Sequence, residues 1–154
     1  MNREEFIQAK LFMFSDVERE IQLARAGARQ LQAMGITPGG GNFLAALALL
    51  CYTEFGGKLQ FGVKRPSANF NKFFDALGRD YAAFRATCNV YDVFRCGLAH
   101  EYYAKKNCTI AMLSTGPGPG IGTESTGHHF FIVENYCRDL KTAFDNLQTS
   151  LFGR

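Results

Sequence analysis

The stretch FLAALALLCYTEF, residues 43–55, indicates the centre of the fold because it is apolar almost all round. A helix with apolar side chains on every side is covered by other elements rather than turned to water on one face. Asn42 stands directly before the stretch, and asparagine is a favoured helix-capping residue. The sequence therefore predicts a central buried helix that Asn42 caps.

Segments with helical character lie on both sides of this stretch. Residues 3–34 are rich in Ala, Leu, Gln, Glu and Arg, and they predict a long opening helix that Gly35 and the following TPGGG end. Ser67 is expected to cap a short helix in SANFNKFFDALG, and a longer helix is expected from Arg79 to about Gly97 or beyond. Residues 135–152 predict an amphipathic closing helix. The glycines and the proline of GGKLQFGVKRPSAN, residues 56–69, predict a loop.

The period of the sequence changes before the closing helix. CTIAMLST (108–115) and GHHFFIVE (127–134) are β-prone, and the Gly/Pro-rich GPGPGIGTEST (116–126) separates them. We expect a β-hairpin with a long tip, packed against the helices because an isolated hairpin is marginally stable in water. The expected fold class is mainly α, a bundle of four to five helices with a β-hairpin inserted before the C-terminal helix.

Composition places this fold in one domain over residues 1–154, because 154 residues with 47% hydrophobic content can bury one full core. A net charge of +3 permits a polyanionic partner but is far from that of a basic nucleic-acid tail. The five cysteines are odd in number and include no C-x-x-C, which argues against a disulfide framework and favours a cytoplasmic location. The charged N-terminus and the lack of an apolar run of about 18 residues predict no membrane association.

The stretch VFRCGLAHEYY, residues 93–103, places a guanidinium in the apolar stripe of the predicted helix that begins at Arg79. Arg95 must be paired there, since an unpaired buried charge is costly. Asp92 is one local partner, and stacking between Tyr91 and Tyr102 is another solution. His100 stands about 140° away around a regular helix and is expected at the helix end. Together Arg95 and His100 supply a cationic phosphate ligand and a proton-exchanging imidazole.

The residues RCGLAHEYY, 95–103, resemble the signature of the HEPN superfamily, which is an arginine, four to six residues and a histidine near the end of a bundle helix. The resemblance implies a HEPN-like RNA-processing or toxin/defence domain, a metal-independent endoribonuclease with Arg95 and His100 as catalytic residues and no cofactor. It also implies a homodimer, in which two motif copies form one composite cleft, and a cognate antitoxin protein as a possible partner. Active members often carry Asn, Asp or His directly after the arginine, where this chain has Cys96. A non-catalytic RNA-binding or protein-interaction module is therefore the alternative.

Beyond the motif, HEYYAKKN (100–107) combines aromatic and basic side chains. This mixture suits base stacking and phosphate contact on single-stranded RNA. We expect Tyr102, Lys105 and Lys106 to bind the substrate, with a solvated turn as the structural alternative.

Three other site types are open at the level of sequence. Cys96 and His100 could begin a zinc site with further ligands among Cys108, His128 and His129, although the spacing matches no standard zinc pattern and the expected site holds no metal. GPGPGIG is glycine-rich like a phosphate loop but lacks its Gly-Lys-Ser/Thr ending. Cys96 could also act as a nucleophile beside His100.

Overall fold

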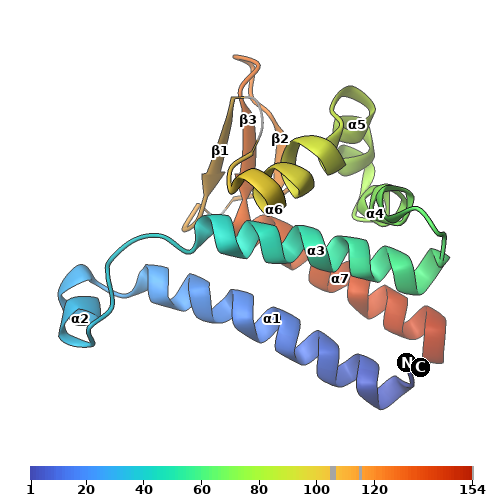
Figure 1. The fold of residues 1–154 in the computed structure, drawn as a ribbon, viewed down its shortest axis with the longest axis horizontal. Coiled ribbons are helices and arrows are strands. Elements are labelled where there is room, and N and C mark those ends of the chain that lie inside the picture. Colours follow the sequence, from blue (N-terminus) through green and yellow to red (C-terminus); the bar gives the residue numbers. More distant parts are fainter. Residues whose placement is uncertain (105–106, 115, 154) are drawn as a thin grey trace.

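Helices make up most of the structure, and a small sheet stands directly before the C-terminal helix (Figure 1). The computed structural model describes residues 1–104, 107–114 and 116–153. In chain order the elements are α1 (Arg3–Arg25), α2 (Ala28–Ala33), α3 (Asn42–Phe61), α4 (Pro66–Asp75), α5 (Arg79–Thr87), the π-helix η1 (Tyr91–Cys96), α6 (Gly97–Glu101), β1 (Cys108–Ala111), β2 (Ile121–Thr123), β3 (His129–Ile132) and α7 (Val133–Phe152). The described residues confirm a mainly helical fold with β-structure before the last helix.

The helix α3 lies in the middle of the fold, as its apolar sequence predicts. Leu49 and Leu50 are completely buried, and α3 contacts α1, α4, α7, η1 and β1 (Figure 1). The N-cap is Gly41, in the left-handed conformation, and not Asn42 as expected. The side-chain amide of Asn42 instead donates a hydrogen bond of 2.7 Å to the carbonyl of Ile110. Asn42 therefore ties α3 to strand β1.

Two glycines extend α3 through the first part of the predicted loop. A Cβ atom on Gly57 would lie 2.1 Å from the backbone oxygen of Asn69 in α4, and one on Gly56 would lie 2.6 Å from the Phe73 ring. The missing side chains let the two helices approach closely. The loop prediction for residues 56–69 is therefore wrong for its helical parts, because these glycines serve helix packing rather than a turn.

The start of α4 also differs from the prediction. Pro66 is the first residue of this helix and Arg65 is its N-cap, so Ser67 lies inside the helix and is not its cap. Proline suits the first helical position because its fixed φ matches the helix and its missing N–H has no helical partner there.

The long helix expected from Arg79 is divided into α5, η1 and α6. The chain leaves α5 at Cys88, which has extended backbone angles (φ −134°, ψ 132°). Neither glycine nor proline marks this break. The opening helix is also divided, because Ala26 is extended (φ −69°, ψ 138°) and Gly27 is the N-cap of α2. Both single-helix predictions are wrong: Gly27 accompanies the first break, whereas local propensity did not reveal the break at Cys88.

The sheet has the strand order β1-β3-β2 and differs from the expected hairpin. Strand β1 pairs with β3 in parallel, with Cys108 opposite His129, whereas β2 pairs with β3 in antiparallel, with Ile121 opposite Phe131. The hairpin is therefore β2–β3, and its second strand agrees with the prediction from GHHFFIVE. Its first strand lies inside the segment expected to be the tip.

Close packing on α7 explains Gly120, the glycine directly before β2. A Cβ atom on Gly120 would lie 2.2 Å from the backbone nitrogen of Tyr136. The amide of Gly120 is itself bound, because it donates a hydrogen bond of 2.8 Å to the hydroxyl of Tyr81. This segment is therefore held against the helices, in contrast to the long free tip expected from its composition.

Two buried tyrosines connect elements of the core through hydrogen bonds of their hydroxyl groups. The hydroxyl of Tyr81 in α5 donates to Oδ2 of Asp139 in α7 at 2.5 Å while it accepts from Gly120. Burial raises the pKa of Tyr81, and the hydrogen bond to Asp139 raises it further. The hydroxyls of Tyr136 and Thr53 lie 2.8 Å apart and connect α7 with α3. These polar groups are satisfied within the core.

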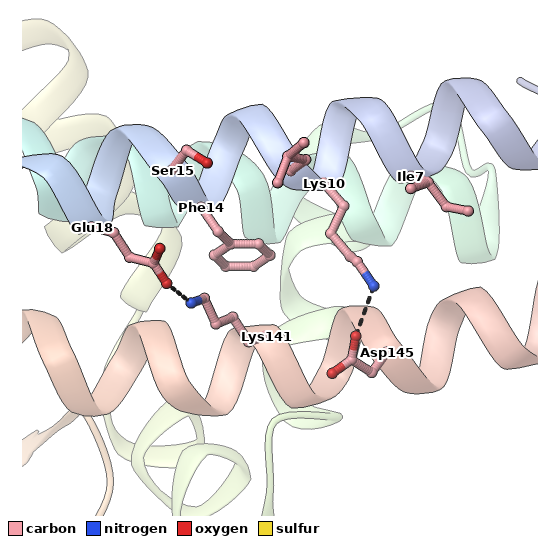
Figure 2. A pocket seen from close by; sticks show the side chains of 8 residues that line it. Ile7, Lys10, Phe14, Ser15, Glu18, Lys141 and Asp145 are labelled. Carbon is pink, nitrogen blue, oxygen red and sulfur yellow. Dashed lines mark hydrogen bonds and ion pairs between the residues drawn. The ribbon is translucent and has the colours of Figure 1, made fainter.

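The helices α1 and α7 pack side by side at the edge of the fold. Figure 2 shows two ion pairs that cross between them, Lys10 with Asp145 at 2.7 Å and Lys141 with Glu18. Phe14 lies between these pairs and points toward α7. The ion pairs frame a groove of about 320 Å³ with an apolar floor.

Two further findings concern the cysteines and the membrane. All five cysteines lie in the described part of the chain, and none of them forms a disulfide. Among the helices that the structure describes, none has both the length and the apolar character to cross a bilayer.

The close approach of α3 and α4 predicts a strong effect of Gly57→Ala. The new methyl group meets backbone atoms of Asn69, which cannot move away like a flexible side chain, so the free energy of unfolding should fall by about 1–3 kcal/mol. Urea denaturation measures this change. Gly116→Ala is the control, because no atom lies within 4 Å of its added Cβ, and it should change stability by less than about 1 kcal/mol. Equal stability of the two variants would contradict this packing.

The Tyr81 hydroxyl is expected to stabilise the junction of α5, α7 and the segment before β2. Tyr81→Phe leaves the buried amide of Gly120 without its acceptor, so the free energy of unfolding should fall by about 1–3 kcal/mol. The same urea titration measures this loss. Tyr103→Phe, at an exposed side chain, should stay within about 0.5 kcal/mol of the wild type. A Tyr81→Phe variant as stable as the Tyr103 control would show that the hydrogen bonds contribute nothing.

Candidate functional site

Arg95 of η1 forms an ion pair with Glu54 of α3. The Nε atom of Arg95 lies 2.9 Å from Oε2 of Glu54, and the two side chains are 21% and 23% exposed. The guanidinium carbon also lies 5.9 Å from the centre of the Tyr91 ring, within the range of a cation–π contact. The expected contact with Tyr91 is confirmed. The ion pair reaches another helix, a partner that the sequence analysis, which considered Asp92, did not name.

The two paired atoms have unused hydrogen-bonding capacity. Nε of Arg95 and Oε2 of Glu54 are both buried, and neither has a hydrogen-bond partner in the described part of the chain. Their distance allows strong attraction, but they lack the alignment of a hydrogen bond, so the contact is mainly electrostatic. Each of the two atoms is therefore balanced by the charge of the other.

The surroundings of Arg95 keep its charge in place. Burial lowers the pKa of the guanidinium, but the influence of Cys51, Glu54, Tyr91 and Cys96 outweighs burial, and the pKa of Arg95 is raised. Burial raises the pKa of the Cys51 thiol even though Arg95 acts in the opposite direction. The site therefore holds a permanent cation beside the neutral thiol of Cys51, which suits the binding of an anion.

A π-helical turn carries Arg95 and Cys96. Such turns use i→i+5 hydrogen bonds, are rare, and are frequent at functional sites. The π-helical turn ends at Cys96 and the α-helix α6 begins at Gly97, so only the start of the interval from Arg95 to His100 departs from a regular α-helix.

His100 lies in the last turn of α6 with an exposed side chain. The helix ends one residue later, and Tyr102 is its C-cap in the left-handed conformation (φ 56°). The expected position at a helix end is confirmed. The helix α6 contacts η1, so the two motif residues belong to adjoining elements, one partly buried and the other open to a ligand.

The aromatic residues after the motif form an exposed surface. The ring of Tyr102 stacks on Phe43 of α3, with ring centres 6.0 Å apart and an angle of 26° between the planes. Tyr102 is 61% exposed and Tyr103 is 54% exposed. Tyr102 therefore packs on Phe43 instead of on Arg95. The other two expected substrate-binding residues, Lys105 and Lys106, lie outside the described residues.

A cleft of about 570 Å³ opens beside the ion pair, between α3 and the start of α4. Glu54 belongs to its wall together with Lys58, Lys64 and Phe55. The sequence analysis assigned no function to this region. Glu54 could have been noticed as the only acidic residue of the apolar stretch 43–55, since a carboxylate in a buried helix needs a partner.

The zinc and phosphate-loop alternatives have no support in the described residues. No three His, Cys, Asp or Glu side chains come together there in a way that could hold a metal ion. His128 instead lies 2.7 Å from the hydroxyl of Thr109, and Nδ1 of His129 lies 2.8 Å from the hydroxyl of Thr123. The glycine-rich segment leads into strand β2 rather than into a helix, which removes the anion site of a phosphate loop.

Comparisons of this chain with protein-family models, curated proteins and solved structures find no match. The likeness to HEPN domains therefore rests on the residues 95–103 and on the helical architecture.

The Arg95–Glu54 pair predicts strong energetic coupling between two helices. Arg95→Ala and Glu54→Ala should each lower the free energy of unfolding by about 1–3 kcal/mol, because each leaves a partly buried charge unpaired. The double variant should lose less free energy of unfolding than the two single variants together, and the difference, the coupling energy, should exceed about 0.5 kcal/mol. Urea denaturation of the four proteins measures this cycle.

The control cycle uses Arg19 and Glu20, an ion pair in which the arginine is 70% exposed. Its coupling should be below about 0.5 kcal/mol, as is common for surface pairs. Additive effects at Arg95 and Glu54 would show that their contact does not stabilise the fold.

Proposed function

We propose that this protein is a HEPN-like bundle that acts as a metal-independent endoribonuclease in RNA processing, defence or a toxin–antitoxin system. The observation that carries the proposal is Arg95, a cation that its ion pair with Glu54 holds beside an open cleft, in the helix segment directly before an exposed His100. A cytoplasmic location and a cognate antitoxin protein belong to the same proposal.

The two residues would divide the chemistry of phosphodiester cleavage. The 2′-oxygen of the RNA attacks the adjacent phosphorus, the bond to the 5′-oxygen breaks, and a 2′,3′-cyclic phosphate and a 5′-hydroxyl remain. His100 takes part in the transfer of a proton from the 2′-hydroxyl or to the leaving 5′-oxygen. Arg95 stabilises the negative charge that develops on the phosphate oxygens. No metal is needed for these steps.

A homodimer would complete the site. His100 and the aromatic residues Tyr102 and Tyr103 are exposed next to Arg95 in the chain, so a second copy can approach this end of α6. Two motif copies across a two-fold axis would then form one composite cleft. Within each chain Glu54 contacts Nε of Arg95 and balances its charge, and the other guanidinium nitrogens of Arg95 can bind the phosphate.

A non-catalytic RNA-binding or protein-interaction module is the second candidate. Cys96 favours it, because a thiol is a poor substitute for the amide or carboxylate that often follows the arginine in active relatives. The ion pair with Glu54 also favours it, since Arg95 then already has a structural role.

Cleavage of single-stranded RNA in the presence of EDTA tests the proposal. The wild type should produce ends with a 2′,3′-cyclic phosphate, and a 2′-deoxy nucleotide at the cleavage site should block the reaction. His100→Ala should lower the rate by about 10²–10⁴-fold, as expected for the loss of a general acid or base. His128→Ala, a histidine bound to Thr109 in the sheet, is the control and should retain full activity.

Two outcomes would decide against a metal-independent endoribonuclease. Activity that disappears with EDTA and returns with zinc would overturn the metal-independent mechanism. RNA binding without cleavage, in a folded wild type, would support the non-catalytic module.

A separate experiment tests the composite site at the dimer interface. A mixture of the Arg95→Ala and His100→Ala proteins should regain part of the wild-type activity. A protein that is a monomer at micromolar concentration would contradict the composite site.

A further inference from the structure

The cleft between α3 and α4 has an excess of positive charge. Lys58 of α3 and Lys64 of the following loop line it, and neither has a carboxylate within ion-pair distance among the described residues. Glu54 also lines the cleft, but Arg95 already balances its charge. The cleft therefore offers two unbalanced cations directly beside the Arg95–Glu54 pair.

The start of α4 adds to the positive electrostatic potential in the cleft. Pro66, the first residue of this ten-residue helix, is part of the cleft wall. The N-terminal end of a helix carries a partial positive charge from the aligned peptide dipoles. Two lysines and a helix start thus surround the same space.

The loop that carries Lys64 is fixed to α4. The side-chain oxygen of Asn69 accepts a hydrogen bond from the amide of Val63 at 3.1 Å, and its side-chain nitrogen donates to the Val63 carbonyl at 2.8 Å. Asn69 is itself buried. The backbone of Val63, the residue before Lys64, is therefore tied to α4 by two hydrogen bonds, which keep this loop beside the cleft.

We propose that this cleft binds the sugar–phosphate backbone of single-stranded RNA beside the phosphate that Arg95 holds. The inference rests on the proposed function, and it adds a second contact region that lies outside the 95–103 motif. Lys58 and Lys64 contact phosphate oxygens, and the half-buried ring of Phe55 in the same wall offers an aromatic face to a base.

An acidic peptide is the other ligand with matching charge. RNA fits better because the cleft is large enough for a nucleotide, joins cations with an aromatic side chain, and includes Glu54, the ion-pair partner of Arg95. Binding of an acidic peptide in place of RNA is one of the results that the test can give.

The test measures the affinity of the full chain for a single-stranded RNA oligonucleotide at several salt concentrations. The Lys58→Gln/Lys64→Gln variant should bind about 10-fold more weakly at low salt. The slope of log K against log salt should become shallower by about 1.4, which corresponds to two lost phosphate contacts on a single strand. Arg25→Gln/Arg29→Gln removes the same charge at the distant α1–α2 end of the fold and should keep the wild-type slope (Figure 1). Equal urea midpoints show that the variants are folded.

The possible failures are distinguishable. If Arg95→Ala weakens RNA binding but the double lysine variant behaves like its control, the cleft is not an RNA site while the proposed function stands. If the wild type binds no RNA, the proposed function and the RNA assignment fall together. If a polyglutamate peptide binds the wild type, loses affinity in the lysine variant, and RNA does not bind, the cleft belongs to an acidic protein segment and the assignment to RNA is wrong.

Discussion

The helix α3 has almost no side that can face water, and the need to cover it constrains the arrangement of the other elements. Leu49 and Leu50 are completely buried, and the burial of one such side chain stabilises a fold by about 1.5–3 kcal/mol. The helices α1, α4, α7 and η1 and the strand β1 all contact α3. Because Gly57 permits the closest of these approaches, the position of α4, and with it one wall of the cleft, follows from the packing of the core.

The candidate site is built into this packing. Glu54 projects from α3 and Arg95 from the π-helical turn, so their contact connects the most buried helix with the segment that carries the motif. A charge pair at this place is a weak source of stability, because both groups lose part of their hydration. The arrangement instead gives a fixed cation next to the cleft that Glu54 lines.

Local patterns in the sequence were sufficient to predict the central helix and the last helix. The apolar run 43–55 predicted the central helix, and the spacing of Tyr136, Leu140 and Phe144 predicted the last one. Patterns could not show where two distant segments meet. Gly57 and Gly120 were interpreted as turn residues because the backbones that approach them belong to other elements. Likewise, the break at Cys88 and the π-helical turn arise from packing and carry no glycine or proline.

Local patterns also could not show which distant segments meet at the candidate site. The motif pointed to Arg95 and His100, and the structure places both in adjoining elements. The partner of Arg95 lies on α3, and the cleft depends on the contact of α3 with α4, so neither could be derived from residues 93–103 alone. The lone carboxylate in an apolar helix was the one available signal.

The parallel pairing of β1 with β3 has a consequence for the order of assembly. The strands β2 and β3 are joined by a short turn and can pair as a local unit, whereas β1 pairs only after the long connection to β3 has closed, at a greater cost in chain entropy. The bond from Asn42 to Ile110 further makes β1 dependent on a formed α3. We therefore expect the strand that follows the motif helix to pair after the β2–β3 hairpin has formed.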